Sequence, residues 1–361
     1  VNDNFAQSEL MGVVRGWTPS EEYEALETAF SERFGDNAAM AKMSKEDVEI
    51  SRVPTLLKNH PMLKPFQLIL GIFSPPTYGT LDPTLLVAVS FVLFYGFILG
   101  DAGYGLFIIG VAAWVQKKWG HHEMIHDAMT IAKWMGASSI VWGIVYAEFF
   151  GNLPELYLGI THPPLHRFHE PIVLLLFAFA YGAVHVPLSL IVGIREGYKH
   201  GHKKHAEEKL GMLLGLLGVG VMVLALTGIV PSGRGYVIAL LLFGGSFYYL
   251  IRGMGSMFGI GVVELVGLTA NVLSYARLMA LGMASVAVAD LANKLLDLPG
   301  VWMLLIGIPG AAFVHLLNIG IGVFSPTIHS LRLNYVEFLP KFYEPEGRSY
   351  QPFRKEMAQW T

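Results

Sequence analysis

The stretch that decides the fold runs from Gly259 to Ala292 and reads GIGVVELVGLTANVLSYARLMALGMASVAVADLA. It is one of the longest apolar runs in the chain, and its charged residues are Glu264, Arg277 and Asp290. About 20 apolar residues suffice to cross the hydrocarbon core of a bilayer, so this longer run predicts a strongly tilted transmembrane helix. Arg277 would then lie near the middle of the membrane.

An arginine at this depth is costly because its guanidinium does not give up its proton. Insertion scales put the cost at roughly 2.5 to 3.5 kcal/mol, so the side chain is expected to face protein or water. Glu264 and Asp290 each lie about 20 Å from Arg277 along an ideal helix and are rotated from it by about 140°. Neither carboxylate can pair with it, so water, another helix or another chain must balance the charge. Arg277 is therefore the first candidate functional residue.

The composition indicates a polytopic membrane protein. Of the 361 residues, 53% are hydrophobic and 15% are charged, and the mean hydropathy is +0.49. The absence of cysteine excludes disulfides, thiol-attached haem and cysteine zinc sites. A net charge of −3 gives no argument for a nucleic-acid partner, and the sequence has no phosphate-binding G-x-x-x-x-G-K-[ST] loop. We expect no cofactor and no metal.

We predict an all-α fold with about eight transmembrane helices, of which the last two are long and strongly tilted. The first two segments are short, and they could instead form one re-entrant hairpin. The approximate helix ranges are 84–99, 103–116, 129–147, 171–194, 210–230, 236–251, 259–292 and 302–334.

The remaining residues divide into soluble regions. Residues 1–53 include a helix over 20–34 whose apolar face has little to cover it, which indicates a remnant of a larger cytoplasmic amino-terminal domain. Residues 54–83, rich in proline and turn residues, form a linker to the membrane domain at 84–334. A short cytoplasmic tail, 335–361, closes the chain.

Charge placement predicts the orientation in the membrane. If the amino terminus is cytoplasmic, the inner loops hold nine Lys and Arg residues and the outer loops hold Arg167, Arg234 and Lys294. This bias sets both termini on the cytoplasmic side.

The last apolar run carries polar residues at a seven-residue spacing, which drifts by only about 20° per step on a helix. Arg332 and His329 are neighbours, three residues apart. A helix with a polar face beside the helix that holds Arg277 suggests an aqueous path walled by both helices. Histidine titrates near neutral pH, so it could relay protons along this path. One polar stripe comprises Asn318, Ser325 and Arg332, and the second comprises His315, Gly322 and His329.

Three motifs carry a family resemblance. The segment 274–281, SYARLMAL, resembles the S-Y-x-R-L-x-A-L signature of the membrane stator of rotary V-type and A-type ATPases, called subunit a or subunit I. The segment 94–105, FYGFILGDAGYG, is similar to the F-[FY]-G-x-x-x-G-D-x-G-Y-G hairpin of that family. The segment 329–338, HSLRLNYVEF, continuing to Lys341-Phe342 and Pro352-Phe353, is similar to its closing motif. The resemblance covers about residues 54–361.

The resemblance implies an integral, multi-pass stator that moves protons or sodium ions onto and off a ring of proteolipid c or L subunits, whose carboxylates bind the ion. It implies a subunit that binds no nucleotide itself, within an ion-translocating rotary ATPase or ATP synthase. It also implies partners for the amino-terminal half, namely peripheral stalk subunits of the E and G type and a central-stalk adaptor. The membrane would be the plasma membrane if the source is prokaryotic.

The same resemblance assigns site residues. Arg277 maps onto the essential arginine that faces the ring between two half-channels, and Arg332 and His329 map onto the second arginine and its neighbour. Eukaryotic relatives place a glutamate where Gly322 stands, so that half-channel would be lined by the other polar groups instead. Candidates for lining are His315, Asn318, Ser325, Ser274 and Asn271, with Glu264 and Asp290 at channel positions.

Several alternatives stay open. Glu264 and Asp290 could be interfacial carboxylates at helix ends, and His315 and His329 could be core histidines rather than relays. We expect His185, in a span that contains Pro187, to be structural. A secondary transporter that binds a small anion at an intramembrane arginine would show inverted repeats, and the sequence has no convincing repeat. A noncatalytic assembly scaffold is a third alternative.

Overall fold

The structure is a computed structural model that describes residues 5–7, 12–43, 53–72, 74–159, 164–345 and 347–350. Part of the closing motif, Pro352-Phe353, lies outside these residues. The chain forms two compact units. Of the described residues, those up to 58, those from 70 to 80 and those from 344 onward belong to the first unit, and those within 59–69 and 81–343 belong to the second.

The first unit is built from short elements. Strands β1 (Phe5–Gln7) and β2 (Gly12–Val14) pair antiparallel, and β3 (Pro54–Thr55) pairs in parallel with β4 (Arg348–Ser349). Helix α1 (Tyr23–Phe34), followed by the 3₁₀ turn Gly35–Asn37, confirms the helix expected over 20–34 but begins three residues later. None of its side chains is buried, so its apolar face is uncovered within this unit.

The second unit holds the long helices, and the predicted all-α class is confirmed. Its helices are α2 (Gln67–Leu70), α3 (Thr84–Leu99), α4 (Ala102–Trp119), α5 (Glu123–Tyr146), α6 (Leu153–Leu158), α7 (Pro171–Lys199), α8 (Lys203–Leu226), α9 (Ser232–Met254), α10 (Phe258–Leu273), α11 (Ala276–Lys294) and α12 (Ile308–Arg332). Short 3₁₀ turns are η4 (Lys64–Phe66), η5 (Gly255–Met257), η6 (Leu295–Asp297) and η9 (Leu339–Lys341), and η7 (Met303–Gly307) and η8 (Leu333–Phe338) are π-helical.

Helix α3 lies at the centre of this unit. It is apolar on all sides, and most of its side chains are buried, as expected for a helix with neighbours all round. It packs against α5, α11 and α12. The aromatic rings of Phe94 and Phe97 join the core around Tyr275 and Tyr146. Because α4 packs along α5 and not back on α3, the two helices do not form the re-entrant hairpin considered above.

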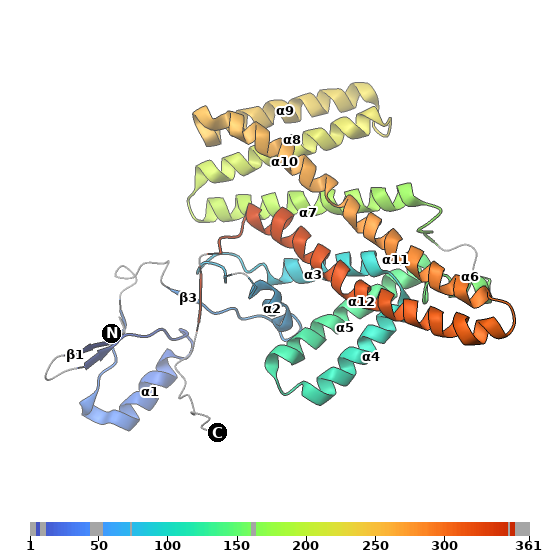
Figure 1. The fold of residues 1–361 in the computed structure, drawn as a ribbon. Helices are drawn as coiled ribbons and strands as arrows, with labels where there is room; N and C mark the ends of the chain where they lie inside the picture. The colour runs from blue at the N-terminus through green and yellow to red at the C-terminus, as the bar shows by residue number, and fades with distance from the viewer. Residues whose placement is uncertain are drawn as a thin grey trace. The chain divides into compact units, whose positions relative to one another are not determined.

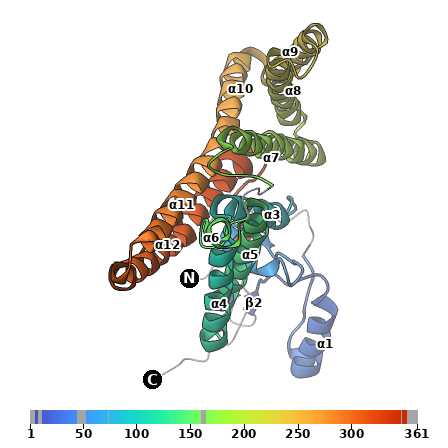
Figure 2. The same ribbon diagram turned by 90° about the vertical axis from the view of Figure 1, so that its right-hand side faces the viewer.

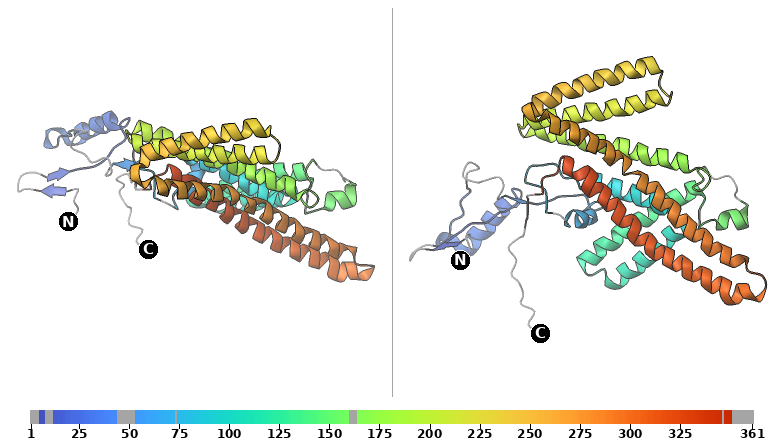
Figure 3. Two further views of the ribbon diagram at one scale, coloured as in Figure 1. Left: turned by 90° about the horizontal axis from the view of Figure 1, so that it is seen from above. Right: turned by 45° about the horizontal axis from the view of Figure 1, so that its top comes forward.

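Most of the other helices form three pairs, α4 with α5, α8 with α9, and α11 with α12 (Figure 1). Helices α8 and α9 make an antiparallel hairpin that packs on α7 and α10. Helices α11 and α12 run side by side, as Figures 2 and 3 show from three further directions. Helix α7 contacts α8, α10 and α11, so it links the hairpin to the long pair.

Among the described residues, five helical stretches are long and apolar enough to cross a membrane: Glu123–Tyr146, Pro171–Lys199, Lys203–Leu226, Ser232–Asp297 and Met303–Lys341. This is fewer than the eight segments expected. One reason is that α3, with 16 residues, is short. Another is that α9, α10 and α11 join in one stretch of 66 residues, although Gly255, with φ +60°, separates α9 from α10.

The two last runs differ in detail from the expectation. The run 259–292 was expected as one helix, but it divides into α10 and α11 at Ser274 and Tyr275. The run expected over 302–334 continues beyond α12, because the π-helical segment η8 and the turn η9 extend it to Lys341. The apolar pattern persists through both places, so periodicity alone did not reveal them.

Candidate functional site

The break between α10 and α11 lies within the SYARLMAL segment. The Ser274 hydroxyl donates to the Ala270 carbonyl, 3.1 Å away, and the Arg277 nitrogen donates to the Ser274 carbonyl at 3.3 Å. The nitrogen of Leu278 likewise reaches back only three residues, to Tyr275. These three-residue bonds tighten the turn locally. Arg277 therefore enters α11 as its second residue, next to the break.

Tyr275 fixes this break against α7. Its ring is fully buried, and its hydroxyl lies 2.6 Å from Nδ1 of His185. A Cβ at Gly182 would lie 2.8 Å from the Tyr275 ring, so α7 needs a glycine there for the ring to fit. His185 in turn stacks in parallel on Phe338, with 4.0 Å between the ring centroids. His185 thus has a structural position, at the base of the SYARLMAL segment.

Arg277 is half-buried at the border of an exposed face of α11. That face carries small side chains, Ala280, Ala284 and Ala287, followed by Leu291. Nη1 of Arg277 is buried and makes no hydrogen bond to any described residue. A guanidinium that is partly desolvated and not locked into a pair can interact with a partner that arrives along this face.

Ionisable groups from the end of the last helix lie near Arg277. His329 interacts electrostatically with Arg277 and Arg332, and so does Glu337, which lies in η8. Arg332 itself is exposed, whereas Glu337 is 1% exposed. The structure therefore brings together three of the predicted site residues and adds a carboxylate, Glu337, that had been quoted only as part of a motif.

Glu264 and Asp290 lie apart from this cluster. Glu264 is exposed on α10, and Asp290 lies near the far end of α11. The structure gives neither of them an ion pair with Arg277, as helix geometry predicted. Asn271 is half-buried on α10 and Ser325 half-buried on α12.

His315 and Asn318 belong to a second polar network, centred on Tyr104 of α4. The Tyr104 hydroxyl lies 2.8 Å from Nδ1 of His315 and accepts from Nδ2 of Asn318 at 3.0 Å. Nε2 of His315 lies 3.1 Å from Oδ1 of Asn293, whose amide donates to Asn152 at 2.8 Å. Both predicted lining residues are thus hydrogen-bonded within the helix interface, and the network ends at Asn152.

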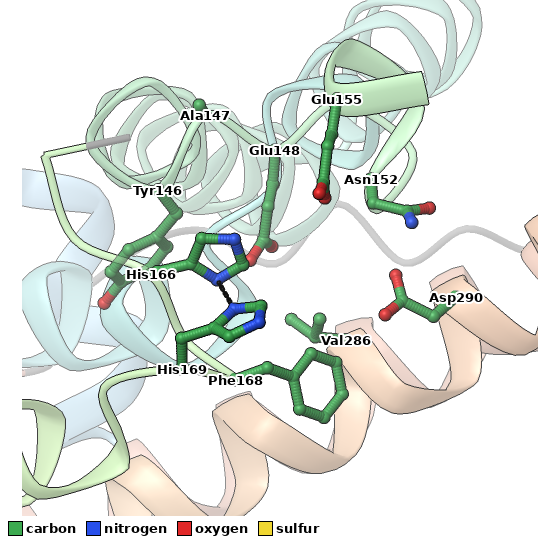
Figure 4. A pocket seen from close by; sticks show the side chains of 10 residues that line it. All are labelled: Tyr146, Ala147, Glu148, Asn152, Glu155, His166, Phe168, His169, Val286 and Asp290. Atoms are coloured by element: carbon green, nitrogen blue, oxygen red, sulfur yellow. Dashed lines mark hydrogen bonds between the residues drawn. The ribbon is translucent and has the colours of Figure 1, made fainter. Parts of the chain in front are cut away.

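A pocket of about 230 Å³ opens beside Asn152. Figure 4 shows three carboxylates around it, Glu148, Glu155 and Asp290, which come from different parts of the chain. His166 and His169 lie beside Glu148 and across the pocket from Asp290, with their Nδ1 atoms 3.0 Å apart. One Asp290 carboxylate oxygen is buried and has no hydrogen-bond partner among the described residues. Of the predicted site residues, Asp290 is the one that lines this pocket.

Arg167 contacts two residues that line this pocket, Glu148 and Tyr146. It is 2% exposed, forms an ion pair with Glu148, and lies over the Tyr146 ring at 4.4 Å. It also donates to the carbonyls of Ile98, Leu99, Gly100 and Gly282 at 2.6 to 3.1 Å. It therefore satisfies the end of α3, where helical carbonyls lack partners. Burial raises the pKa of Glu148, while the Arg167 guanidinium opposes that rise.

The GDAGYG segment is explained by the same region. Gly100 has φ +43°, and a Cβ there would lie 2.4 Å from the Tyr146 ring. Asp101 caps α4 by accepting from the Tyr104 nitrogen at 2.9 Å, and it also accepts from the nitrogens of Phe150 and Gly151. The motif thus builds the α3–α4 corner on which the pocket loop rests.

Close packing also explains why a glycine stands at position 322. A Cβ at this position would lie 2.7 Å from Cδ1 of Leu99, and the Gly322 carbonyl accepts from the Tyr95 hydroxyl at 3.1 Å. Helices α3 and α12 approach so closely here that a glutamate could not be accommodated without a shift of Leu99.

Comparison with known proteins agrees with the three motifs. A model of the V-type ATPase 116 kDa subunit family matches residues 3–158. The A-type ATP synthase subunit I of Methanocaldococcus jannaschii is 29% identical over 97% of this chain and 56% of its own length, and that of Archaeoglobus fulgidus is 30% identical over 88% of this chain and 56% of its own. The V-type ATP synthase subunit I of Borreliella burgdorferi is 25% identical over 98% of this chain and 62% of its own.

The chain spans little more than half the length of these curated relatives. The matches nonetheless include nearly all of its own residues, among them the membrane-type helices and the site around Arg277. This chain therefore belongs to the V-type ATPase 116 kDa subunit family.

Proposed function

We propose that this chain is the stator subunit of a rotary V/A-type ATPase. It forms two offset half-channels for protons or sodium ions and, through Arg277, couples their passage to rotation of a proteolipid ring. That rotation is linked to ATP hydrolysis or synthesis elsewhere in the complex. The names of the relatives, A-type and V-type ATP synthase subunit I, support this assignment.

The observation that carries the proposal is the state of Arg277. Its guanidinium is partly buried, Nη1 makes no hydrogen bond to a described residue, and an exposed row of alanines continues along the same helix. Small side chains allow close helix approach in membranes. A ring helix with an ionised carboxylate could pass along Ala280, Ala284 and Ala287 and meet the arginine at their end.

Two separate polar regions support the half-channels. One surrounds Arg277 and contains His329, Arg332 and Glu337. The other is the pocket that holds Asp290, at the opposite end of α11. Arg277 and Asp290 are separated by about 20 Å along a helix at 1.5 Å per residue. The Tyr104 network with His315 and Asn318 extends from the pocket side toward the middle of α12.

The physical mechanism needs no bond chemistry from this chain. A protonated ring carboxylate is neutral and can face lipid, whereas an ionised one is costly there and is attracted to Arg277. The arginine favours deprotonation as a carboxylate arrives, and its fixed charge blocks a direct leak between the two regions. Each charge that crosses is worth about 2.3 kcal/mol per 100 mV, and rotation transmits this energy.

The topology follows the same proposal. The helices α3, α4, α5, α7, α8 and α9, the joined α10–α11, and α12 make eight crossings, of which the last two are long and tilted. Both termini lie on the cytoplasmic side, with residues 1–53 as the remnant of a cytoplasmic domain that meets the peripheral stalk and the central-stalk adaptor. Residues 335–361 form a cytoplasmic tail.

The test is the Arg277→Ala variant in the full-length subunit, assembled with its ring and catalytic sector in lipid vesicles. We expect ATP-driven ion transport to be abolished, while ATP hydrolysis by the detached catalytic sector is unchanged. Arg234→Ala, which removes an exposed arginine at the start of α9, is the matched control. Full ATP-driven transport by Arg277→Ala would refute the assignment.

A further inference from the structure

Glu337 is a carboxylate in an unusual position. Its side chain is 1% exposed, and Oε2 is buried with no hydrogen-bond partner among the described residues. An isolated buried carboxylate is strongly unfavourable unless nearby charge compensates it. The nearby charges are the guanidinium groups of Arg277 on α11 and Arg332 on α12.

The π-helical form of η8 explains how Glu337 reaches these groups. On an α-helix, five residues rotate by about 140°, so Glu337 would point away from Arg332. The wider π turn closes with bonds between residues five apart, which brings such residues close to one face. Residues Leu333–Phe338 adopt this form directly after Arg332. The local helix type thus places Glu337 near the side of the helix that carries Arg332.

The packing behind Glu337 holds it in place. The next residue, Phe338, is fully buried and stacks on His185, and His185 contacts the Tyr275 hydroxyl. The same three aromatic groups therefore position both the carboxylate and the helix break that carries Arg277.

Arg277 and Glu337 have opposite charges but do not form a direct ion pair. Arg277 and Glu337 interact electrostatically, yet Nη1 of Arg277 and Oε2 of Glu337 each lack a hydrogen bond to the described residues, and the structure gives no ion pair between them. A buried ion pair with full hydrogen bonding is strongly unfavourable to break, so it would hold Arg277 away from any other partner. A looser interaction lets the guanidinium exchange partners.

We infer that Glu337 is the internal counter-charge of Arg277, which balances the guanidinium whenever no ionised ring carboxylate faces it. This inference rests on the stator function proposed above, and it makes Glu337 a positioning residue that acts through Arg277. As a ring carboxylate leaves, Glu337 takes over the interaction. Without Glu337, the arginine would hold each ring carboxylate longer, so rotation would slow while each turn still carried its ions.

The experiment uses the complete complex in vesicles and measures ATP turnover and the number of ions moved per ATP. We expect Glu337→Gln to slow coupled turnover by about tenfold, a factor equal to about 1.4 kcal/mol in a barrier, with the ion-to-ATP ratio unchanged. Glu337→Asp keeps the charge and should stay within about twofold of the natural protein. Glu196→Gln is the matched control, because Glu196 is a similarly buried glutamate on α7 that accepts from the Leu81 nitrogen.

Copurification of the ring checks the assembly of each variant. Unchanged turnover in Glu337→Gln would overturn the inference, and so would fast ATP hydrolysis without transport, which would indicate a leak. If Glu337→Gln fails to assemble, Glu337→Asp still decides, because a tenfold slower Asp variant contradicts a role based on charge. Failure of the stator function itself looks different, since Arg277→Ala would then transport ions normally.

Discussion

The hydroxyl of Tyr275 lies 2.6 Å from Nδ1 of His185, and this contact ties the break between α10 and α11 to the middle of α7. Both side chains are buried. Arg277 follows the tyrosine by two residues, so the orientation of its helix depends on this anchor. Tyr275 and His185 therefore affect Arg277 indirectly, by positioning the helix that carries it.

The first prediction concerns this anchor. Tyr275→Phe leaves Nδ1 of His185 buried without a partner, and Nε2 already lacks one among the described residues. A lost partner of this kind costs about 1 to 3 kcal/mol. Thermal unfolding of the purified subunit should show this loss, and ion transport should fall with it.

The double variant His185→Phe/Tyr275→Phe is the informative companion. Replacing both polar partners by apolar groups of similar shape is nearly neutral, so stability should recover most of the loss. Tyr198→Phe, at an exposed position on α7, should change stability by less than about 0.5 kcal/mol. If the double variant is no more stable than Tyr275→Phe alone, the hydrogen bond is not what the tyrosine contributes.

The second prediction concerns Arg167. Arg167→Met removes the donor that satisfies the end of α3 and leaves Glu148 buried without its ion-pair partner. Removing one member of a buried pair costs about 3 to 5 kcal/mol. Unfolding temperature and retention of the ring on purification should both decrease, whereas Arg234→Met should change neither.

The variant Glu148→Gln/Arg167→Met separates the two contributions. It removes the stranded carboxylate charge but leaves the carbonyls of Ile98, Leu99 and Gly100 without their donor. Partial recovery of stability is therefore expected. Full recovery of stability would mean that the carbonyl contacts contribute little. No recovery would mean that the stranded Glu148 charge, and so the ion pair, contributes little.

The third prediction tests the close approach of α5 to the α3–α4 corner. A Cβ at Gly143 would lie 2.2 Å from the Ala102 nitrogen and 2.8 Å from the Asp101 carbonyl carbon, which are backbone atoms that cannot rotate away. Gly143→Ala should destabilise the fold by about 1 to 3 kcal/mol or more. A Cβ at Gly110 on α4 would meet nothing within 4 Å, so Gly110→Ala should be neutral or stabilising by about 0.5 to 1 kcal/mol. Equal effects of the two changes in a thermal unfolding experiment would contradict the observed packing.

The features that could be predicted from the sequence are those that depend on composition and on hydrophobic periodicity. The all-α class, the long apolar helices and the family motifs could be found because hydrophobic length and local spacing determine them. Helix geometry also separated Arg277 from Glu264 and Asp290 correctly. The proximity of His329 and Arg332 to Arg277 followed from the expectation that the last two helices lie together.

What the sequence did not reveal depends on contacts between distant segments. Glu337 lies 60 residues after Arg277, and its direction depends on a π-helical turn that has no pattern in the residue types. Arg167 was counted only as an outer-loop charge, because periodicity says nothing about where a loop side chain points. The break at Ser274 and Tyr275 was missed since the apolar pattern continues through it, although Tyr275 was quoted in the motif.

The last prediction concerns the pocket of Figure 4. Asp290 lines it from α11, with one buried oxygen that no described residue contacts, while Glu148 and Glu155 face it from the other side. If this pocket is the outer part of the ion path, Asp290→Asn removes a group that can take up and release a proton. Because two other carboxylates remain, we expect transport to slow by about tenfold rather than stop.

The matched control is Asp297→Asn, which changes an exposed carboxylate seven residues later, beyond the end of α11. Both variants are measured for ATP-driven ion uptake and for ATP turnover in the same vesicles. Asp297→Asn should behave as the natural protein, while Asp290→Asn should lower uptake and turnover together, because a blocked outer path stalls rotation. Equal transport by both variants would place the ion path elsewhere than this pocket and leave Asp290 as a carboxylate at a helix end.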